Sequence, residues 1–213
     1  QEYLAIGKKM QYVGENSGDY KAVIPLMAPN SVQLMVVQSN YEPNDKTFVD
    51  LECAYSINDV NLFSNSNASE VKAPAVKAMW EQTLWEQKWK TTSLIQFDFV
   101  HQNFNNLEGT YDVEFDRDWN LNETVGNQSL LNGTITFENE ENGSFYYQFE
   151  NLKLSDLYNG KRHNLGATLA FGKWEWNQWS SMLNSKDELF QTHFIRNESQ
   201  VKFTNQKWWS QAE

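Results

Sequence analysis

Alternating apolar and polar positions dominate the chain. Residues 46–57 place Val49, Leu51 and Cys53 on one side of an extended segment, and residues 93–100 alternate in the same way. Successive side chains of a strand point to opposite faces of a sheet. The pattern therefore predicts strands with one apolar and one polar side.

Turn-forming residues separate these runs at short intervals. Residues 130–154 form the best predicted hairpin, because two alternating runs flank the polar segment 138–143 (ENEENG). Asn159–Gly160 predicts a second tight turn, and residues 111–118 alternate cleanly enough to predict another strand. No strand–helix–strand alternation is present. We therefore expect one mainly β domain over residues 1–213, an antiparallel β-sandwich or a barrel-like curved sheet.

One helix is predicted to pack on this sheet, over about residues 70–89. Ser69 is a suitable N-cap, and Pro74 would lie near the first turn. On such a helix Trp85 and Trp89 fall opposite Trp80, so one sheet could not cover both stripes. Three alternatives follow: a helix between two layers, unwinding near residue 84, or a partner that contacts Trp85 and Trp89. A second short helix is predicted over about 182–195.

Composition restricts the partners of this fold. The net charge is −11 and the sequence pI is about 4.8, so the surface repels nucleic-acid backbones and anionic lipid. We predict no nucleic-acid partner. Aromatic residues make up 15% of the chain, including nine Trp, which predicts a folded protein. The one cysteine, Cys53, lies in an apolar run and is predicted to be buried.

The compartment is predicted from weaker signals. No apolar run is long enough for a membrane-spanning helix, so no membrane span is predicted. The chain begins at Gln1 rather than Met, which indicates either a processed mature chain or a trimmed one, and we favour processing after export. N-x-S/T sequons are also frequent, although the abundance of Asn explains much of that. We expect an extracytoplasmic protein, periplasmic or secreted.

A row of acidic residues in residues 111–118 is a candidate for cation binding. It comprises Asp112, Glu114, Asp116 and Asp118. The continuation through Asn120 resembles a calcium loop, but Leu121 stands where an EF-hand needs Gly. We therefore predict a solvated acidic face and assign no metal and no cofactor, with a calcium loop of another type than the EF-hand as the alternative.

The strongest candidate for ligand binding lies in residues 171–179 (FGKWEWNQW). Exposed aromatic rings can stack on sugar rings, while neighbouring amides and carboxylates bind hydroxyls. The predicted ligand-binding residues are Trp174, Glu175, Trp176, Asn177 and Trp179. Trp174 and Trp176 should share one strand face, with Glu175 on the other.

Three functions compete on this evidence. The favoured one is a non-catalytic binding protein that holds a glycan or a hydrophobic small molecule through these aromatics. A carbohydrate-active enzyme would need two carboxyls, for which Glu175 with Glu114 or Asp112 is the candidate pair. An assembly subunit would contact a protein partner through Trp85 and Trp89. The sequence favours a non-catalytic protein over an enzyme but does not decide between them. It leaves the oligomeric state open.

Overall fold

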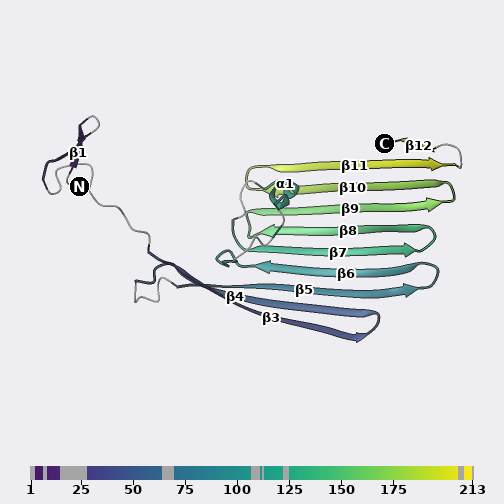
Figure 1. Ribbon diagram of the computed structural model, residues 1–213, viewed down its shortest axis with the longest axis horizontal. Coiled ribbons are helices and arrows are strands. Elements are labelled where there is room, and N and C mark those ends of the chain that lie inside the picture. Colours follow the sequence, from purple (N-terminus) through teal and green to yellow (C-terminus); the bar gives the residue numbers. More distant parts are fainter. Residues whose placement is uncertain are drawn as a thin grey trace.

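The computed structural model describes residues 3–6, 9–14, 28–63, 70–106, 111, 113–121, 125–205 and 209–212. Within them, ten antiparallel strands form one open sheet, in which each strand pairs with its neighbours in the chain (Figure 1). The strands are β3 (Ser31–Asn44), β4 (Thr47–Asp59), β5 (Glu70–Glu86), β6 (Lys90–Val100), β7 (Gln128–Asn139), β8 (Gly143–Leu154), β9 (Tyr158–Phe171), β10 (Trp174–Asp187), β11 (Gln191–Thr204) and β12 (Trp209–Ala212). A separate two-stranded sheet contains β1 (Tyr3–Ile6) and β2 (Lys9–Tyr12).

The mainly antiparallel β prediction is confirmed, and the strands make a single open sheet. The predicted strands over 46–57 and 93–100 are β4 and β6. The predicted hairpin over 130–154 is the β7–β8 pair, in which Phe137 lies opposite Phe145. Gly143 closes its turn with a φ of 97°, a left-handed conformation that favours glycine. Alternation and turn chemistry were therefore sufficient for these elements.

The predicted helix over about 70–89 is wrong. Residues 70–86 form β5, the longest strand, which pairs with β4 and β6 along its length. Ala, Glu, Gln, Lys and Met favour a helix locally, but pairing on both sides outweighs that preference. A β-bulge between Thr83 and Trp85 also brings Trp85 to the face that carries Trp80. Trp80 and Trp85, which fall on opposite stripes of the predicted helix, therefore lie on one side of a strand.

The predicted second helix over about 182–195 is also wrong. This segment contains the end of β10, a turn and the start of β11. The side chain of Asp187 makes the turn, because its Oδ1 accepts the backbone N–H groups of Leu189, at 2.8 Å, and Phe190. Such an Asp turn stands where the helix was predicted.

Two smaller predictions also fail. The described part of residues 111–118 is not a strand: Phe115–Trp119 form the short helix α1. Asn159 and Gly160 lie inside β9, and the preceding turn includes Ser155, whose φ is 47°. A local sequence motif cannot reveal whether a neighbouring strand is present to extend the ladder.

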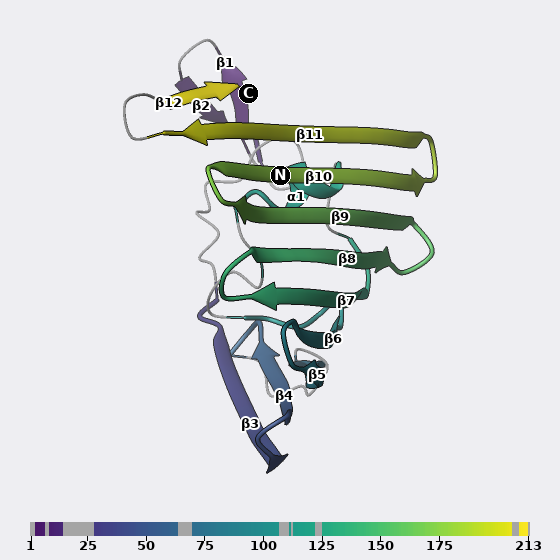
Figure 2. The same cartoon turned by 90° about the vertical axis from the view of Figure 1, so that its right-hand side faces the viewer.

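The core of the described sheet is small and lies under α1. Trp119 of α1 is almost completely buried against Leu152, Leu154, Tyr158 and Leu183, which come from β8, β9 and β10. The Tyr158 hydroxyl donates a hydrogen bond to the backbone carbonyl of Trp119. Elsewhere the described strands form a single row (Figure 2). Within the described part of the chain, both faces of the sheet are therefore largely uncovered.

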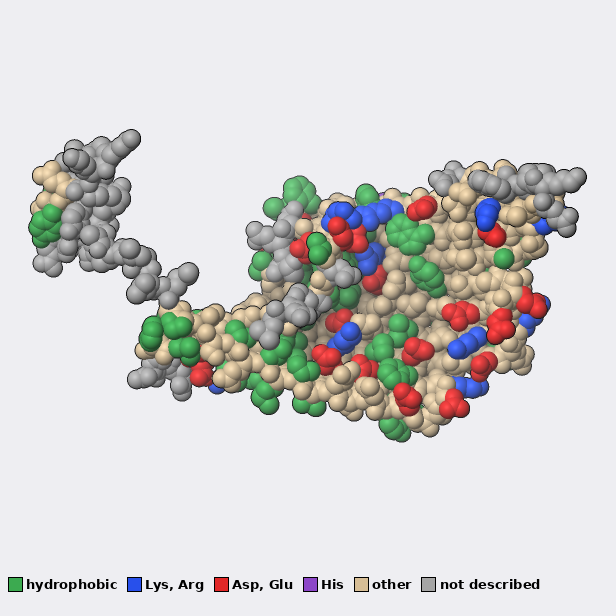
Figure 3. Space-filling view, viewed as in Figure 1, with side chains coloured by type: hydrophobic (Ala, Val, Ile, Leu, Met, Phe, Trp, Pro, Cys, Tyr) green, Lys and Arg blue, Asp and Glu red, His purple; other side chains and the backbone are tan. Residues whose placement is uncertain are grey.

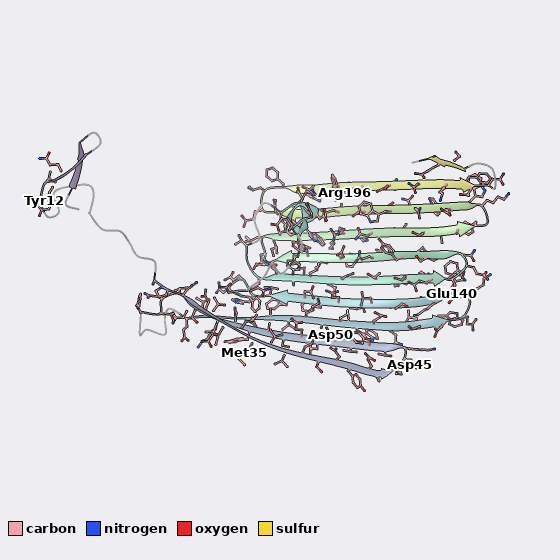
Figure 4. The ribbon with its side chains drawn as sticks, in the orientation of Figure 1. Tyr12, Met35, Asp45, Asp50, Glu140 and Arg196 are labelled. Atoms are coloured by element: carbon pink, nitrogen blue, oxygen red, sulfur yellow. The ribbon has the colours of Figure 1, made fainter. Side chains whose placement is uncertain are left out.

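The two ends of the strands differ. Arg196 lies beside α1, whereas Asp45 and Glu140 lie in turns at the opposite ends of the strands (Figure 4). We call these the α1 end and the far end. The Arg196 guanidinium is 3.0 Å from a carboxylate oxygen of Asp118, which ties β11 to α1.

Candidate functional site

The two faces of the sheet have opposite chemistry. We call the side that carries α1 the α1 face and the other side the apolar face. On β5, for example, Lys77 belongs to the α1 face, whereas Val76 and Ala78 belong to the apolar face. Register carries this division through every strand, because directly paired residues share a face.

The apolar face is continuous from β3 to β11. Its exposed large side chains include Met35, Val37, Tyr55, Leu51, Trp80, Ile95, Phe97, Leu131, Ile135, Phe145, Tyr147, Leu165, Trp174, Trp176, Ile195 and Val201. Met35 is 64% exposed and Ile195 62% exposed, although these two residues lie near opposite edges of the sheet. Cys53 is exposed on the same face, so the prediction that it is buried is wrong. Isolated exposed apolar residues are ordinary, but a patch across nine strands marks an interaction surface.

Charge is confined to one end of the apolar face. Among the paired positions of β3 to β11, the charged residues on this face are Asp59, Glu70, Lys72, Lys153, Lys161 and Lys186. All six lie at the α1 end. From there to the far end, the described positions of this face carry no Asp, Glu, Lys or Arg.

Polar side chains in the middle of the apolar face bond to one another. Gln178, Ser180 and Asn197 form a closed group, in which the Gln178 amide and the Ser180 hydroxyl each donate to Asn197 Oδ1 at 2.7 Å. The Tyr147 hydroxyl lies 2.7 Å from His163 Nδ1. These groups thereby satisfy part of their hydrogen-bonding capacity without water.

Aromatic rings collect at the far end of the apolar face. Phe145 stacks on Phe137 with ring centroids 4.5 Å apart, and Trp89 contacts the edge of the same group at 5.8 Å. Trp174 packs on Phe203 at 4.7 Å, beside an apolar hollow of about 340 Å³. The apolar face therefore ends in aromatics on one side and charges on the other.

The structure separates the predicted ligand-binding residues of 171–179. Trp174 and Trp176 lie on the apolar face, opposite Phe203 and Val201 of β11. Glu175, Asn177 and Trp179 alternate with them, so they lie on the α1 face. The predicted alternation is confirmed, but these five residues do not surround one ligand.

The remaining candidates can also be placed. Trp85 is 57% exposed on the apolar face, and Trp89 is half-buried in the β5–β6 turn against Phe145. Glu175 is exposed and lies 3.1 Å from the Lys202 ammonium. Glu114 pairs with Arg117 in α1, and Asp112 lies outside the described residues.

The α1 face is rich in charge, and Lys, Arg, Asp and Glu side chains are spread over it in Figure 3. Glu150 is buried on this face, and its Oε2 accepts hydrogen bonds from Arg162 Nε at 2.7 Å and from Asn164 Nδ2 at 2.9 Å. The Arg162 guanidinium also lies over the Trp119 ring at 4.4 Å. Beside this group a cleft of about 620 Å³ opens between α1 and strands β3 to β9.

Sequence reasoning identified individual tryptophans but missed the apolar face as a whole. The signal was available in the alternation of β4, β6 and β8, whose apolar sides were each recognised separately. What was missing was the assumption that no second layer covers them.

Within the described ranges, no helix is long and apolar enough to cross a membrane. The same part of the chain contains no group of three or more His, Cys, Asp or Glu side chains placed to hold a metal ion. No protein-family model matches the chain, and comparisons with curated proteins and with solved structures gave no significant match.

Proposed function

We propose that the protein is a non-catalytic lipid-binding protein whose apolar face lies against the acyl chains of a lipid membrane. The observation that carries this proposal is the charge-free apolar surface from β3 to β11, which is interrupted by charge only at the α1 end. Exposing such a surface to water costs roughly 25 cal/mol of free energy per Å² of apolar area. Hydrocarbon removes that cost.

The polar groups on the apolar face fit the same environment. A polar group in hydrocarbon costs several kcal/mol unless it is hydrogen-bonded, by rough estimate from transfer data. Gln178, Ser180 and Asn197 bond to one another, and so do Tyr147 and His163. Their arrangement therefore lowers the cost of contact with acyl chains.

The charge-free stretch of the apolar face is long enough for a broad contact with a hydrocarbon layer. The charge-free stretch of this face runs from Pro74 to Trp85 in β5 and from Trp174 to Asn184 in β10. At about 3.3 Å per residue, such stretches extend roughly 30–40 Å. Because only the apolar face is free of charge, the sheet would lie flat against the hydrocarbon with the α1 face in water. Aromatic rings at the far end suit the boundary between hydrocarbon and water.

Two copies placed face to face would cover the same residues and are the main competitor. The polar group of Gln178, Ser180 and Asn197 and the wide extent of the face favour a fluid occupant over one rigid partner. Lipid is also consistent with the predicted class of hydrophobic ligands. Extracytoplasmic location stays a prediction, and no described contact favours the carbohydrate-active enzyme, because Glu175 pairs with Lys202.

The test compares two tryptophans three residues apart on β10. Trp176 belongs to the apolar face and Trp179 to the α1 face. In each variant, Trp119 and one of these two are retained and the other tryptophans become phenylalanine. The full-length variants are added to phosphatidylcholine vesicles with brominated acyl chains, which quench only rings within the hydrocarbon. The vesicles are uncharged because the protein carries a net charge of −11.

We expect brominated chains to quench Trp176 emission and leave Trp179 emission unchanged. Equal quenching of both, or of neither, contradicts the proposal. Vesicle flotation and light scattering of the unmodified chain separate the competitor. A dimer in water that does not float with vesicles would assign the apolar face to a second copy.

A further inference from the structure

The cleft on the α1 face is a second site of different chemistry. One wall is aromatic: the Tyr111 and Phe115 rings stack on each other, with centroids 4.0 Å apart and planes within 8° of parallel. Trp119 is tilted by 48° to Phe115 and is almost completely buried under the Arg162 guanidinium. Because the stacked Tyr111 and Phe115 rings cover each other's inner faces, the pair can offer an outer ring face to the C–H groups of a ligand.

The floor of the cleft is polar and comes from three neighbouring strands. Lys77 of β5, Asp98 of β6 and Leu130 of β7 are adjacent in register, with Gln96 and Asn132 one step along. The Gln96 amide donates to both carboxylate oxygens of Asp98, at 3.0 and 3.3 Å. Burial is the main reason that the pKa of Asp98 is raised, although Gln96 and Lys77 oppose the shift.

Asn132 presents a defined group to the same space. Its Oδ1 accepts hydrogen bonds from Gln148 Nε2 and Thr134 Oγ1, both at 3.2 Å. The amide Nδ2 hydrogens are then its remaining donors. The floor thus combines a carboxylate acceptor at Asp98 with donors at Lys77 and Asn132.

Tyr111 supplies an unsatisfied group. Its hydroxyl is buried and has no hydrogen-bond partner among the described residues. Burial, together with the negative charge of Asp98, raises the pKa of Tyr111 to about 12, so the phenol keeps its proton at neutral pH. Buried polar atoms without partners are rare and call for a partner such as a ligand or a water molecule.

We propose that this cleft binds a neutral sugar, a mono- or disaccharide, against the Tyr111–Phe115 wall. Stacking would hold one face of the ring, while Asp98, Asn132 and the Tyr111 hydroxyl bind its hydroxyl groups. The volume lies within the roughly 300–1,000 Å³ typical of small-molecule sites. Opposite charges stand side by side at Lys77 and Asp98 and at Arg162 and Glu150, which disfavours a strongly charged ligand. The proposal does not depend on lipid binding.

The test titrates the full-length protein with glucose, maltose and cellobiose, using isothermal calorimetry and tryptophan emission. At least one of them should bind saturably with a Kd near 1 mM or below, a typical small-ligand range of roughly 4 kcal/mol or more. Asp98→Asn and Tyr111→Phe change few atoms and should each weaken binding about tenfold. Trp179→Ala is the matched control, because Trp179 lines a separate hollow on the same face.

The outcomes are distinct. Circular dichroism and melting confirm that each variant is folded, and Lys77→Met, at an exposed floor position, replaces any variant that is not. Loss of affinity in the cleft variants with Trp179→Ala unchanged supports the proposal. It is overturned if none of the three sugars binds, or if Trp179→Ala alone abolishes binding. Because no lipid is added, failure here leaves the lipid proposal to its own test.

Discussion

The same strands build two surfaces that differ in how their side chains are stabilised. On the α1 face, charged groups stand beside partners of opposite sign, as Glu150 does with Arg162, and α1 covers part of the sheet. On the apolar face, Phe97 and Ile135 are about 40% exposed and nothing in the described part of the chain covers them. Charged groups on the α1 face such as Glu150 therefore find partners within the chain. The apolar side chains of the other face need an external partner to be removed from water. Substitutions in the core on the α1 face should lower stability in water, whereas substitutions on the apolar face should act mainly when lipid is present.

The largest expected effect is on stability in water. Trp119→Ala removes the central side chain of the core on the α1 face and should lower the free energy of unfolding by about 3–5 kcal/mol. Trp85→Ala, on the exposed apolar face, should change it by less than about 1 kcal/mol. Urea denaturation without lipid measures both. Equal losses would mean that the apolar face is already covered in water.

Lipid binding should show the reverse sensitivity. Ile135→Lys places a charge within the apolar face, at an expected cost of about 2–4 kcal/mol in hydrocarbon. Vesicle affinity should therefore fall at least about thirtyfold. Thr136→Lys, next in sequence but on the α1 face, is the control and should float like the unmodified protein. Indistinguishable flotation of the two variants would remove the distinction between the faces.

A smaller effect should appear only when lipid is present. Asn197→Ala takes away the shared acceptor of Gln178 and Ser180, leaving two donors without that partner. In water, solvent replaces the lost bonds. Against acyl chains the loss should cost about 1–3 kcal/mol, measured as reduced vesicle affinity. Ser199→Ala on the same strand is the comparison, since Ser199 only accepts a 3.3 Å bond from Trp176. A loss of stability in water as large as that in vesicles would contradict the prediction.

The smallest effect concerns pH. Because burial raises the pKa of Asp98 above its ordinary value of 3.8, the folded state holds this proton more tightly than the unfolded state. Folding stability should then decline as pH rises from about 3.8 through the raised pKa. Asp98→Asn should abolish that part of the decline and raise stability at neutral pH by less than about 1 kcal/mol. Melting temperatures from pH 3 to pH 7 measure it, and an unchanged slope in the variant would refute the assignment.

The sequence was most informative where strand period and turn chemistry agreed. β4, β6 and the β7–β8 hairpin, with their two faces, follow from alternation alone. It was least informative where helix-forming residues lie in a strand, as in β5, or where a side chain such as Asp187 makes the turn. The predicted site of 171–179 failed as a unit for a related reason: alternation divides adjacent tryptophans between faces, and only the register shows which residues join them. Tyr111 and Asp98 were beyond prediction, because they meet through a loop rather than through a repeat.

The bulge in β5 sets the phase of one end of the sheet. Leu84 is the extra residue, since Thr83 pairs with Thr92 and Trp85 with Thr91. Deleting Leu84 would make Thr83 and Trp85 consecutive residues of a regular ladder, so the Trp85 indole would stay on the apolar face and only the bulge would be lost. One residue added at a regular position of β5 would instead invert the faces of every residue beyond it, so such an insertion should be far more harmful than deletion of Leu84.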